Sequence, residues 1–305
     1  MRTYYFGAVA AAAILSMASH GYAVVRHDDA FETSNGNPAG PSNWFAKFGS
    51  NASGIAIGPN HILTTRHQGG GVGTSINFPS GPNAGTYTVT SQTLIGDANT
   101  DLRVLTINNG SSLAYASLYT GTTVGQTALL GGFGPQRTTP NYVNGSNQLV
   151  GYGLTNTPGN GNSLLFGQNR IDSTATGSSP WTSTPLLVAD FDGPESVPTG
   201  IAPAATNKVD YEAVLAEGDS GGGWFIDVAG TPRLVGLSHG AALNRVNGGV
   251  VGPYSGAGTP AFFLGNTIAA VDLTSFTGQI NAAIPEPTSL AVLGLGFITA
   301  LRRRR

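Results

Sequence analysis

Short apolar runs alternate along this chain with turns rich in glycine, proline and asparagine. The runs with strand-like composition are residues 54–57, 62–65, 86–94, 102–107, 128–130 and 142–150. A helical period of 3.6 residues appears only near the end, over residues 273–283. Many short strands and few helices predict an all-β fold built as barrels or a sandwich. The stretches 155–162 and 193–205 are rich in turn residues, which predicts long loops.

The first residues have the pattern of a secretory signal peptide. Met1 and Arg2 give a basic start, residues 4–17 are apolar, and Gly21-Tyr22-Ala23 is a small-x-small site. The alternative is a membrane anchor, but the apolar run is short for a membrane span. We therefore expect residues 1–23 to be a signal peptide that is removed after Ala23.

The last residues form a second targeting pattern. Pro285-Glu286-Pro287 is followed by an apolar segment, residues 289–301, and by four arginines, Arg302 to Arg305. Together these features resemble the PEP-CTERM sorting signal, over residues 284–305. The resemblance implies a Gram-negative source, recognition by exosortase-type machinery and transient membrane association. It also implies export to the cell envelope, cell surface or extracellular matrix. The alternative is a permanent C-terminal anchor.

Composition limits what the intervening residues 24–283 can do. The chain has 305 residues, 40% of them hydrophobic and only 10% charged, which suits one large all-β domain. Between the two targeting segments acidic residues outnumber basic ones, and the two lysines are Lys47 and Lys208. Such a domain is a poor partner for nucleic acid. The chain has no cysteine, so its fold depends on the core rather than on disulfides.

The stretch with the clearest chemistry is Gly218-Asp219-Ser220-Gly221-Gly222. Glycines on both sides of Ser220 allow a sharp turn that exposes the hydroxyl and aims backbone N–H groups at one point. A nucleophilic serine needs both features, because its attack creates an oxyanion. The alternative is a glycine-rich surface loop.

A serine nucleophile needs a base, and the base needs an orienting group. Of the five histidines, His67 ends an apolar strand and precedes a glycine run. Asp101 is the candidate orienting group; Asp97, four residues earlier, lies among small residues where a turn-capping aspartate is common. Asp190 and Asp192 could bind calcium, but two carboxylates in a loop are usually solvated.

Five segments in order resemble the chymotrypsin-like serine proteases. They are residues 62–67 (ILTTRH), 100–105 (TDLRVL), 131–134 (GGFG), 218–222 (GDSGG) and 234–240 (LVGLSHG). The resemblance implies two packed six-stranded antiparallel β-barrels and a short C-terminal helix. It implies His67 as general base and acid, Asp101 as its orienting group and Ser220 as nucleophile. The implied oxyanion hole is the N–H groups of Gly218 and Ser220, and the substrate-binding residues are Val214, Ser238, His239 and Gly240.

Two departures from the family pattern bear on the site. Arg66 and Arg103 stand beside the proposed base and its partner, where the family has small residues. An arginine near a buried carboxylate competes for it, unless its side chain points away. Val214, at the implied pocket floor, carries no charge, so we expect cleavage after small to medium apolar residues. The alternative is acid specificity, with His239 binding the acidic side chain.

These patterns predict an exported serine endopeptidase that hydrolyses protein or peptide substrates through an acyl-enzyme, with no cofactor and no metal. One alternative is an esterase-like hydrolase with the same triad. Another is a catalytically inactive, surface-displayed binding protein. In the family the aspartate at Asp219 pairs with a freed apolar N-terminus, which here would be Val24; the alternative is that Asp219 pairs locally.

Overall fold

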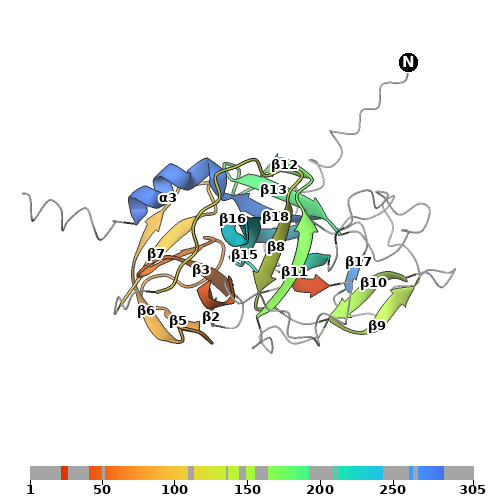
Figure 1. The fold of residues 1–305 in the computed structure, drawn as a ribbon, viewed down its shortest axis with the longest axis horizontal. Helices are drawn as coiled ribbons and strands as arrows, with labels where there is room; N and C mark the ends of the chain where they lie inside the picture. Colours follow the sequence, from red (N-terminus) through yellow and green to blue (C-terminus); the bar gives the residue numbers. More distant parts are fainter. Residues whose placement is uncertain are drawn as a thin grey trace, which may run out of the picture.

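In a computed structural model, the regular secondary structure of the described residues is almost entirely β-strand (Figure 1). The structure describes residues 22–26, 41–49, 52–108, 113–134, 137–143, 149–154, 164–191, 209, 212–216, 218–242, 261–263 and 267–284. The predicted loops 155–162 and 193–205 lie outside these residues, as do most of the two targeting segments. None of the helices in the described ranges has the length and hydrophobicity needed to cross a membrane.

Six strands from the first half of the chain close into a barrel. They follow the order β2-β3-β4-β7-β6-β5, with every neighbouring pair antiparallel. Their bounds are β2 Phe45–Phe48, β3 Ala52–Gly58, β4 His61–Thr64, β5 Ser75–Phe78, β6 Gly85–Leu94 and β7 Arg103–Ile107. All residues of β3 and β4 are buried, which explains why both strands read as continuous apolar runs.

A seven-stranded sheet, built from strands between residues 127 and 272, packs against this barrel. Its order is β11-β8-β15-β16-β18-β13-β12. The bounds are β8 Thr127–Gly132, β11 Leu165–Arg170, β12 Ser173–Thr176, β13 Pro185–Asp190, β15 Gly223–Val228, β16 Thr231–Ala242 and β18 Thr267–Asp272. One apolar cluster joins the two units: Phe45 and Ile55 from the barrel contact the same cluster as Phe166 and Phe225 from the sheet. Burial of these aromatic rings fixes the two units against each other.

Two smaller sheets flank the larger one. Strand β1, Tyr22–Arg26, pairs antiparallel with β14, Ala213–Ala216, and places Val24 in a buried apolar cluster. Strands β9 (Arg137–Val143), β10 (Leu149–Leu154) and β17 (Ala261–Phe263) form a three-stranded sheet.

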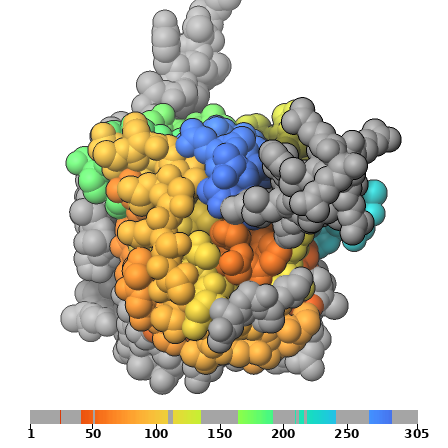
Figure 2. Space-filling model, turned by 90° about the vertical axis from the view of Figure 1, so that its left-hand side faces the viewer, coloured from red at the N-terminus to blue at the C-terminus, as the bar shows by residue number. Residues whose placement is uncertain are grey.

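A short helical segment closes the described chain. A 3₁₀ turn, Leu273–Phe276, is capped by the Asp272 side chain and leads into helix α3, Thr277–Ala283. An earlier 3₁₀ turn, η2, spans Pro41–Trp44. Figure 2 shows α3 in blue lying over the orange and yellow strands of the first barrel. Ile280 of α3 is buried, and Ile284 directly after the helix packs beside Gly58. Ile284 therefore packs against the first barrel, directly after the predicted boundary at residue 283.

The predicted all-β fold with a closed six-stranded barrel and a short C-terminal helix is confirmed. The second barrel is a curled seven-stranded sheet in the described residues. The predicted strands at 54–57, 62–65, 86–94, 102–107 and 128–130 correspond to β3, β4, β6, β7 and β8. The single strand predicted over 142–150 is wrong, because that region contributes to two antiparallel strands, β9 and β10.

Candidate active site

His67 and Asp101 meet beyond the ends of two adjacent strands of the barrel. β4 and β7 pair antiparallel with Thr64 opposite Arg103, so the residues that follow β4 and precede β7 emerge side by side. His67 Nδ1 lies 2.6 Å from Asp101 Oδ2. The other carboxylate oxygen, Oδ1, accepts the backbone N–H groups of Arg66 at 2.7 Å and His67 at 2.8 Å. The two bonds to Oδ1 hold the carboxylate in one orientation, and the bond to Oδ2 orients the His67 imidazole.

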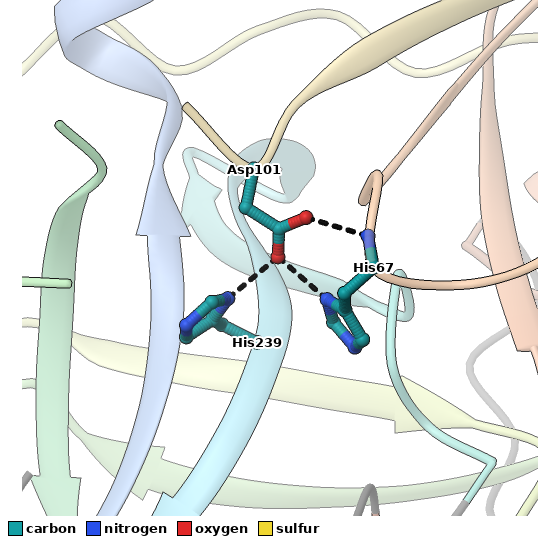
Figure 3. Close-up of side chains that lie close together, drawn as sticks. All are labelled: His67, Asp101 and His239. Carbon is teal, nitrogen blue, oxygen red and sulfur yellow. Dashed lines mark hydrogen bonds and ion pairs between the residues drawn. The ribbon is translucent and has the colours of Figure 1, made fainter. Parts of the chain in front are cut away.

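A second imidazole binds the same carboxylate from the other sheet. His239 Nδ1, on β16, lies 2.7 Å from Asp101 Oδ2 (Figure 3). The rings of His67 and His239 are perpendicular, with centroids 5.6 Å apart. An ionised carboxylate only accepts hydrogen bonds, so both Nδ1 atoms carry a proton. His67 is thereby left with Nε2 as its basic nitrogen.

The electrostatics of this cluster depend on the hydrogen bonds to Asp101. The carboxyl group is completely buried, and burial alone would raise its pKa. The hydrogen bonds from His239 and His67, with the charge interactions of the two rings, outweigh burial and hold the pKa of Asp101 well below its usual range. The carboxylate is therefore ionised throughout the neutral range.

The same three residues form the group with metal-ligand spacing among the described residues. Their nitrogen and oxygen atoms are 2.6 and 2.7 Å apart, which is the spacing of charge-assisted hydrogen bonds. Ligands bound to zinc at about 2.0 Å lie farther from one another than this. The donor set therefore suits a proton-sharing cluster better than a metal site.

Ser220 lies on the turn before β15, and this turn contacts Ser53 of the first barrel. Its carbonyl accepts the Ser53 N–H at 2.9 Å, and the Ser53 hydroxyl donates to the Gly218 carbonyl at 3.1 Å. Gly221 has a φ of +75°, and a Cβ there would collide with the Ser53 carbonyl. Glycine is therefore required next to Ser220 both for its conformation and for this close approach.

The backbone around the turn leaves donors available. Within the described part of the chain, the N–H groups of Gly218 and Ser220 donate to no protein acceptor, whereas Gly221 N–H donates to Ser238 O at 2.8 Å. Ser220 Oγ makes no hydrogen bond to His67 among these residues. The structure therefore joins His67 to Asp101 directly and positions Ser220 through its backbone.

Asp219 points inward from the same turn. It is completely buried, and Gly134 N–H donates to its Oδ1 at 3.3 Å. Burial raises the pKa of Asp219 well above its usual value, and the Gly134 hydrogen bond opposes this only in part. Gly132 is needed beside it, because a Cβ there would collide with the carboxylate.

The side chains of the two unexpected arginines donate hydrogen bonds to the loops around the site. Arg66 Nη1 donates to the carbonyls of Asp97, Ala98 and Thr100, at 2.8–3.1 Å, and its guanidinium lies over Trp181. Arg103 Nη2 donates to the carbonyls of Gln68 and Gly69, directly after His67. Both side chains thus bond backbone carbonyls rather than the Asp101 carboxylate. Burial lowers the pKa of Arg103, and Asp101 opposes that change.

Other predicted site residues have different surroundings. Asp97 is exposed and accepts the Asn99 N–H at 2.7 Å, as expected of a turn-capping aspartate. Val214 is fully buried in the apolar cluster that also contains Val24. Ser238 is buried, and its hydroxyl accepts the Trp224 indole N–H at 3.1 Å. Gly240 is half-buried on β16. Asp190 ends β13 half-buried, whereas Asp192 lies outside the described residues.

Sequence reasoning missed three polar contacts of the site. Ser53 receives the Ser220 turn, Thr184 Oγ1 accepts the Asp101 N–H at 2.9 Å, and His239 binds the carboxylate. Ser53 and Thr184 lie in stretches without a motif. His239 was associated with the substrate cleft because of the resemblance, although its Nδ1 is directed at Asp101.

A protein-family model matches the C-terminal end of the chain. Residues 283–305 match the family model described as the PEP-CTERM protein-sorting motif, which confirms that prediction. The motif indicates an exported protein that is sorted to the cell envelope or surface through exosortase-type machinery. No curated protein matches the sequence.

Solved structures similar to this chain include a peptidase, a serine protease and a further protease. Kallikrein-related peptidase 10 is 12% identical, with a TM-score of 0.48 over 81% of this chain and 98% of its own. Neuropsin, a serine protease of mouse brain, is 15% identical, with a TM-score of 0.45 over 80% and 96%. An inactive form of the Rv3671c protease is 15% identical, with a TM-score of 0.45 over 89% and 100%.

Proposed function

We propose that this protein is an exported serine endopeptidase with the triad His67, Asp101 and Ser220. The proposal rests on the 2.6 Å contact between His67 Nδ1 and Asp101 Oδ2, which leaves Nε2 as a base of fixed orientation. Ser220 Oγ attacks the substrate carbonyl, and Nε2 takes the hydroxyl proton and then gives it to the leaving amine. Water, activated by the same nitrogen, releases the acyl group.

The N–H groups of Gly218 and Ser220 form the oxyanion hole in this mechanism. Their lack of a protein acceptor in the described part of the chain supports this role, because an oxyanion can then accept both. Asp101 stays ionised and stabilises the imidazolium as it forms. No cofactor takes part in any step.

The substrate-binding residues in this proposal are Ser238, Gly240 and Val214, whereas His239, which the resemblance also implies, bonds Asp101. The β16 backbone would pair with an extended peptide as an added strand. Val214 offers no negative charge, which favours small to medium apolar side chains before the cut bond. Acid specificity is the alternative, and it would use the other ring nitrogen of His239, because Nδ1 bonds Asp101.

The targeting segments extend the proposal. Residues 1–23 would direct export in a Gram-negative cell, and the segment after Ile284 would associate transiently with the membrane before exosortase-type processing. The product would remain in the envelope, on the surface or in the extracellular matrix. Processing after Ile284 would keep the contact of that residue with Gly58.

Labelling with a fluorophosphonate probe tests the proposal. The wild-type domain should be labelled at Ser220, and Ser220→Ala should lose labelling and about 10⁴- to 10⁶-fold of peptide turnover. Thermal unfolding should show that the variant is folded. Turnover of esters without peptides would favour the esterase, and a folded wild-type protein that resists the probe would favour the inactive binding protein.

A further inference from the structure

The Asp101 carboxylate is a junction between the barrel and the second sheet. It accepts four hydrogen bonds: two backbone N–H groups at Oδ1 and the two imidazoles at Oδ2. Three of the donors come from the segment after β4, in the barrel that also carries Asp101. The fourth, His239, comes from β16 of the other sheet, as Figure 3 shows.

Strand β16 also holds the turn that carries Ser220. Gly221 N–H donates to Ser238 O at 2.8 Å, and Ser238 N–H donates to Gly222 O at 2.8 Å. Ser238 is the immediate neighbour of His239. The β16 residue that bonds the Ser220 turn and the β16 residue that binds Asp101 are therefore adjacent in the sequence.

Local backbone geometry determines which residue of β16 faces the carboxylate. The pairing of β16 with β18 shifts register between Ser238 and Gly240, as at a β-bulge. A bulge re-aims the side chain at that point. The Ser238 hydroxyl accepts from the Trp224 indole instead, so His239 supplies the contact from β16 to Asp101.

We infer that His239 is a positioning residue, which sets the Asp101–His67 pair in register with Ser220 through its hydrogen bond to Asp101 Oδ2. This inference deepens the proposed function and rests on it for its kinetic consequences. The carboxylate is fixed at Oδ1 by its own barrel and at Oδ2 by the sheet that holds the nucleophile. The interaction orients the catalytic pair and does not contact the substrate, so its loss lowers kcat and leaves KM unchanged.

Two substitutions separate this role from others. His239→Leu removes the donor, whereas His239→Asn keeps an N–H donor near the place of Nδ1. Outer hydrogen-bond partners of functional groups typically contribute about 10- to 100-fold to activity. We expect His239→Leu to lower kcat and the fluorophosphonate labelling rate by about that factor, with KM within about twofold. His239→Asn should restore most of the loss.

The matched control is His61→Asn. His61 is a buried histidine at the start of β4, and its Nδ1 has no hydrogen-bond partner in the described residues. This variant removes one imidazole and should keep the wild-type kcat. A change in KM as the main effect of His239→Leu would indicate a cleft residue and overturn the inference. A wild-type kcat in His239→Leu, or no rescue by asparagine, would overturn it as well.

Proton NMR tests the contact without relying on turnover. Nδ1–H protons bonded to a carboxylate resonate far downfield, and selective ¹⁵N-histidine labelling assigns them. Wild type and His61→Asn should show two such histidine signals and His239→Asn only one. One signal in the wild type would overturn the inference. Two signals in a protein that the probe does not label would instead overturn the proposed function and leave the contact established.

Discussion

The first barrel and the second sheet hold their site residues by different means. His67 and Asp101 are held by side chains of their own barrel: Arg103 bonds the carbonyls after His67, and Arg66 bonds the loop before Asp101. Ser220 is held by its backbone, through a turn in which Gly221 approaches the Ser53 carbonyl. The barrel half of the site should therefore be sensitive to the loss of polar side chains. The sheet half should be sensitive to the gain of a single Cβ.

The largest effect on the barrel half is expected from Asp101→Asn. The amide cannot accept four hydrogen bonds, and it favours the wrong tautomer of His67, which in the serine protease triad costs about 10⁴-fold in kcat. Steady-state kinetics on a peptide substrate measure the loss. Asp97→Asn is the control, because Asp97 is exposed and caps a turn. Equal losses in both variants would contradict the assignment of Asp101.

The matching change in the sheet half is Gly221→Ala. The new Cβ meets the Ser53 carbonyl at a φ of +75°, so the turn must shift and Ser220 with it. A displacement of about 1 Å costs about 10²-fold in rate. Gly230→Ala is the control, because Gly230 has a φ of +82° with open space around it. It should show strain of about 1 kcal/mol in thermal unfolding and an unchanged kcat. Equal kinetics in both variants would refute the close-approach argument.

A smaller effect is expected from Arg103→Lys. The ammonium cannot reproduce the planar fork of the guanidinium, so the paired bonds to Gln68 and Gly69 are lost. We expect a loss of about 1–3 kcal/mol in urea unfolding, because the group is buried and its bonds are charge-assisted. Arg233→Lys, on a half-buried position of β16, should change stability by less than about 0.5 kcal/mol. A stability equal to wild type in Arg103→Lys would show that the paired bonds of Arg103 to Gln68 and Gly69 do not stabilise the fold.

The smallest expected effect is the change in unfolding free energy when the pH is lowered. The folded-state pKa of Asp101 is lowered, so its contribution to stability is present above the unfolded-chain pKa, about 3.9, and is lost as the pH falls below it. The gap in unfolding free energy between wild type and Asp101→Asn should shrink by about 1 kcal/mol from pH 6 to pH 3. Urea unfolding at both pH values measures it. A constant gap would mean that the four donors do not stabilise the charged form.

The two halves also differ in how far sequence predicted them. Strand β3 and the residues before His67 have clear apolar runs with turns between them, and their prediction is confirmed. The contact between His67 and Asp101 was expected from ordered motifs. The contact of His239 was not, because it depends on a register shift in β16 that no spacing in the sequence reveals. Long-range partners such as Thr184 were missed for a related reason, since tertiary packing alone brings them to the site.

Strand β1 has a consequence for the order of events during export. The bond after Ala23, where the leader is expected to be cut, lies inside a strand whose Tyr22 and Val25 pair with Ala216 and Val214. A peptidase binds its substrate as an extended, unpaired segment. The bond after Ala23 therefore cannot be cut while β1 is paired with β14. If the leader is cut after Ala23, its removal would have to precede the pairing of β1 with β14, because that pairing would hold the bond within a strand.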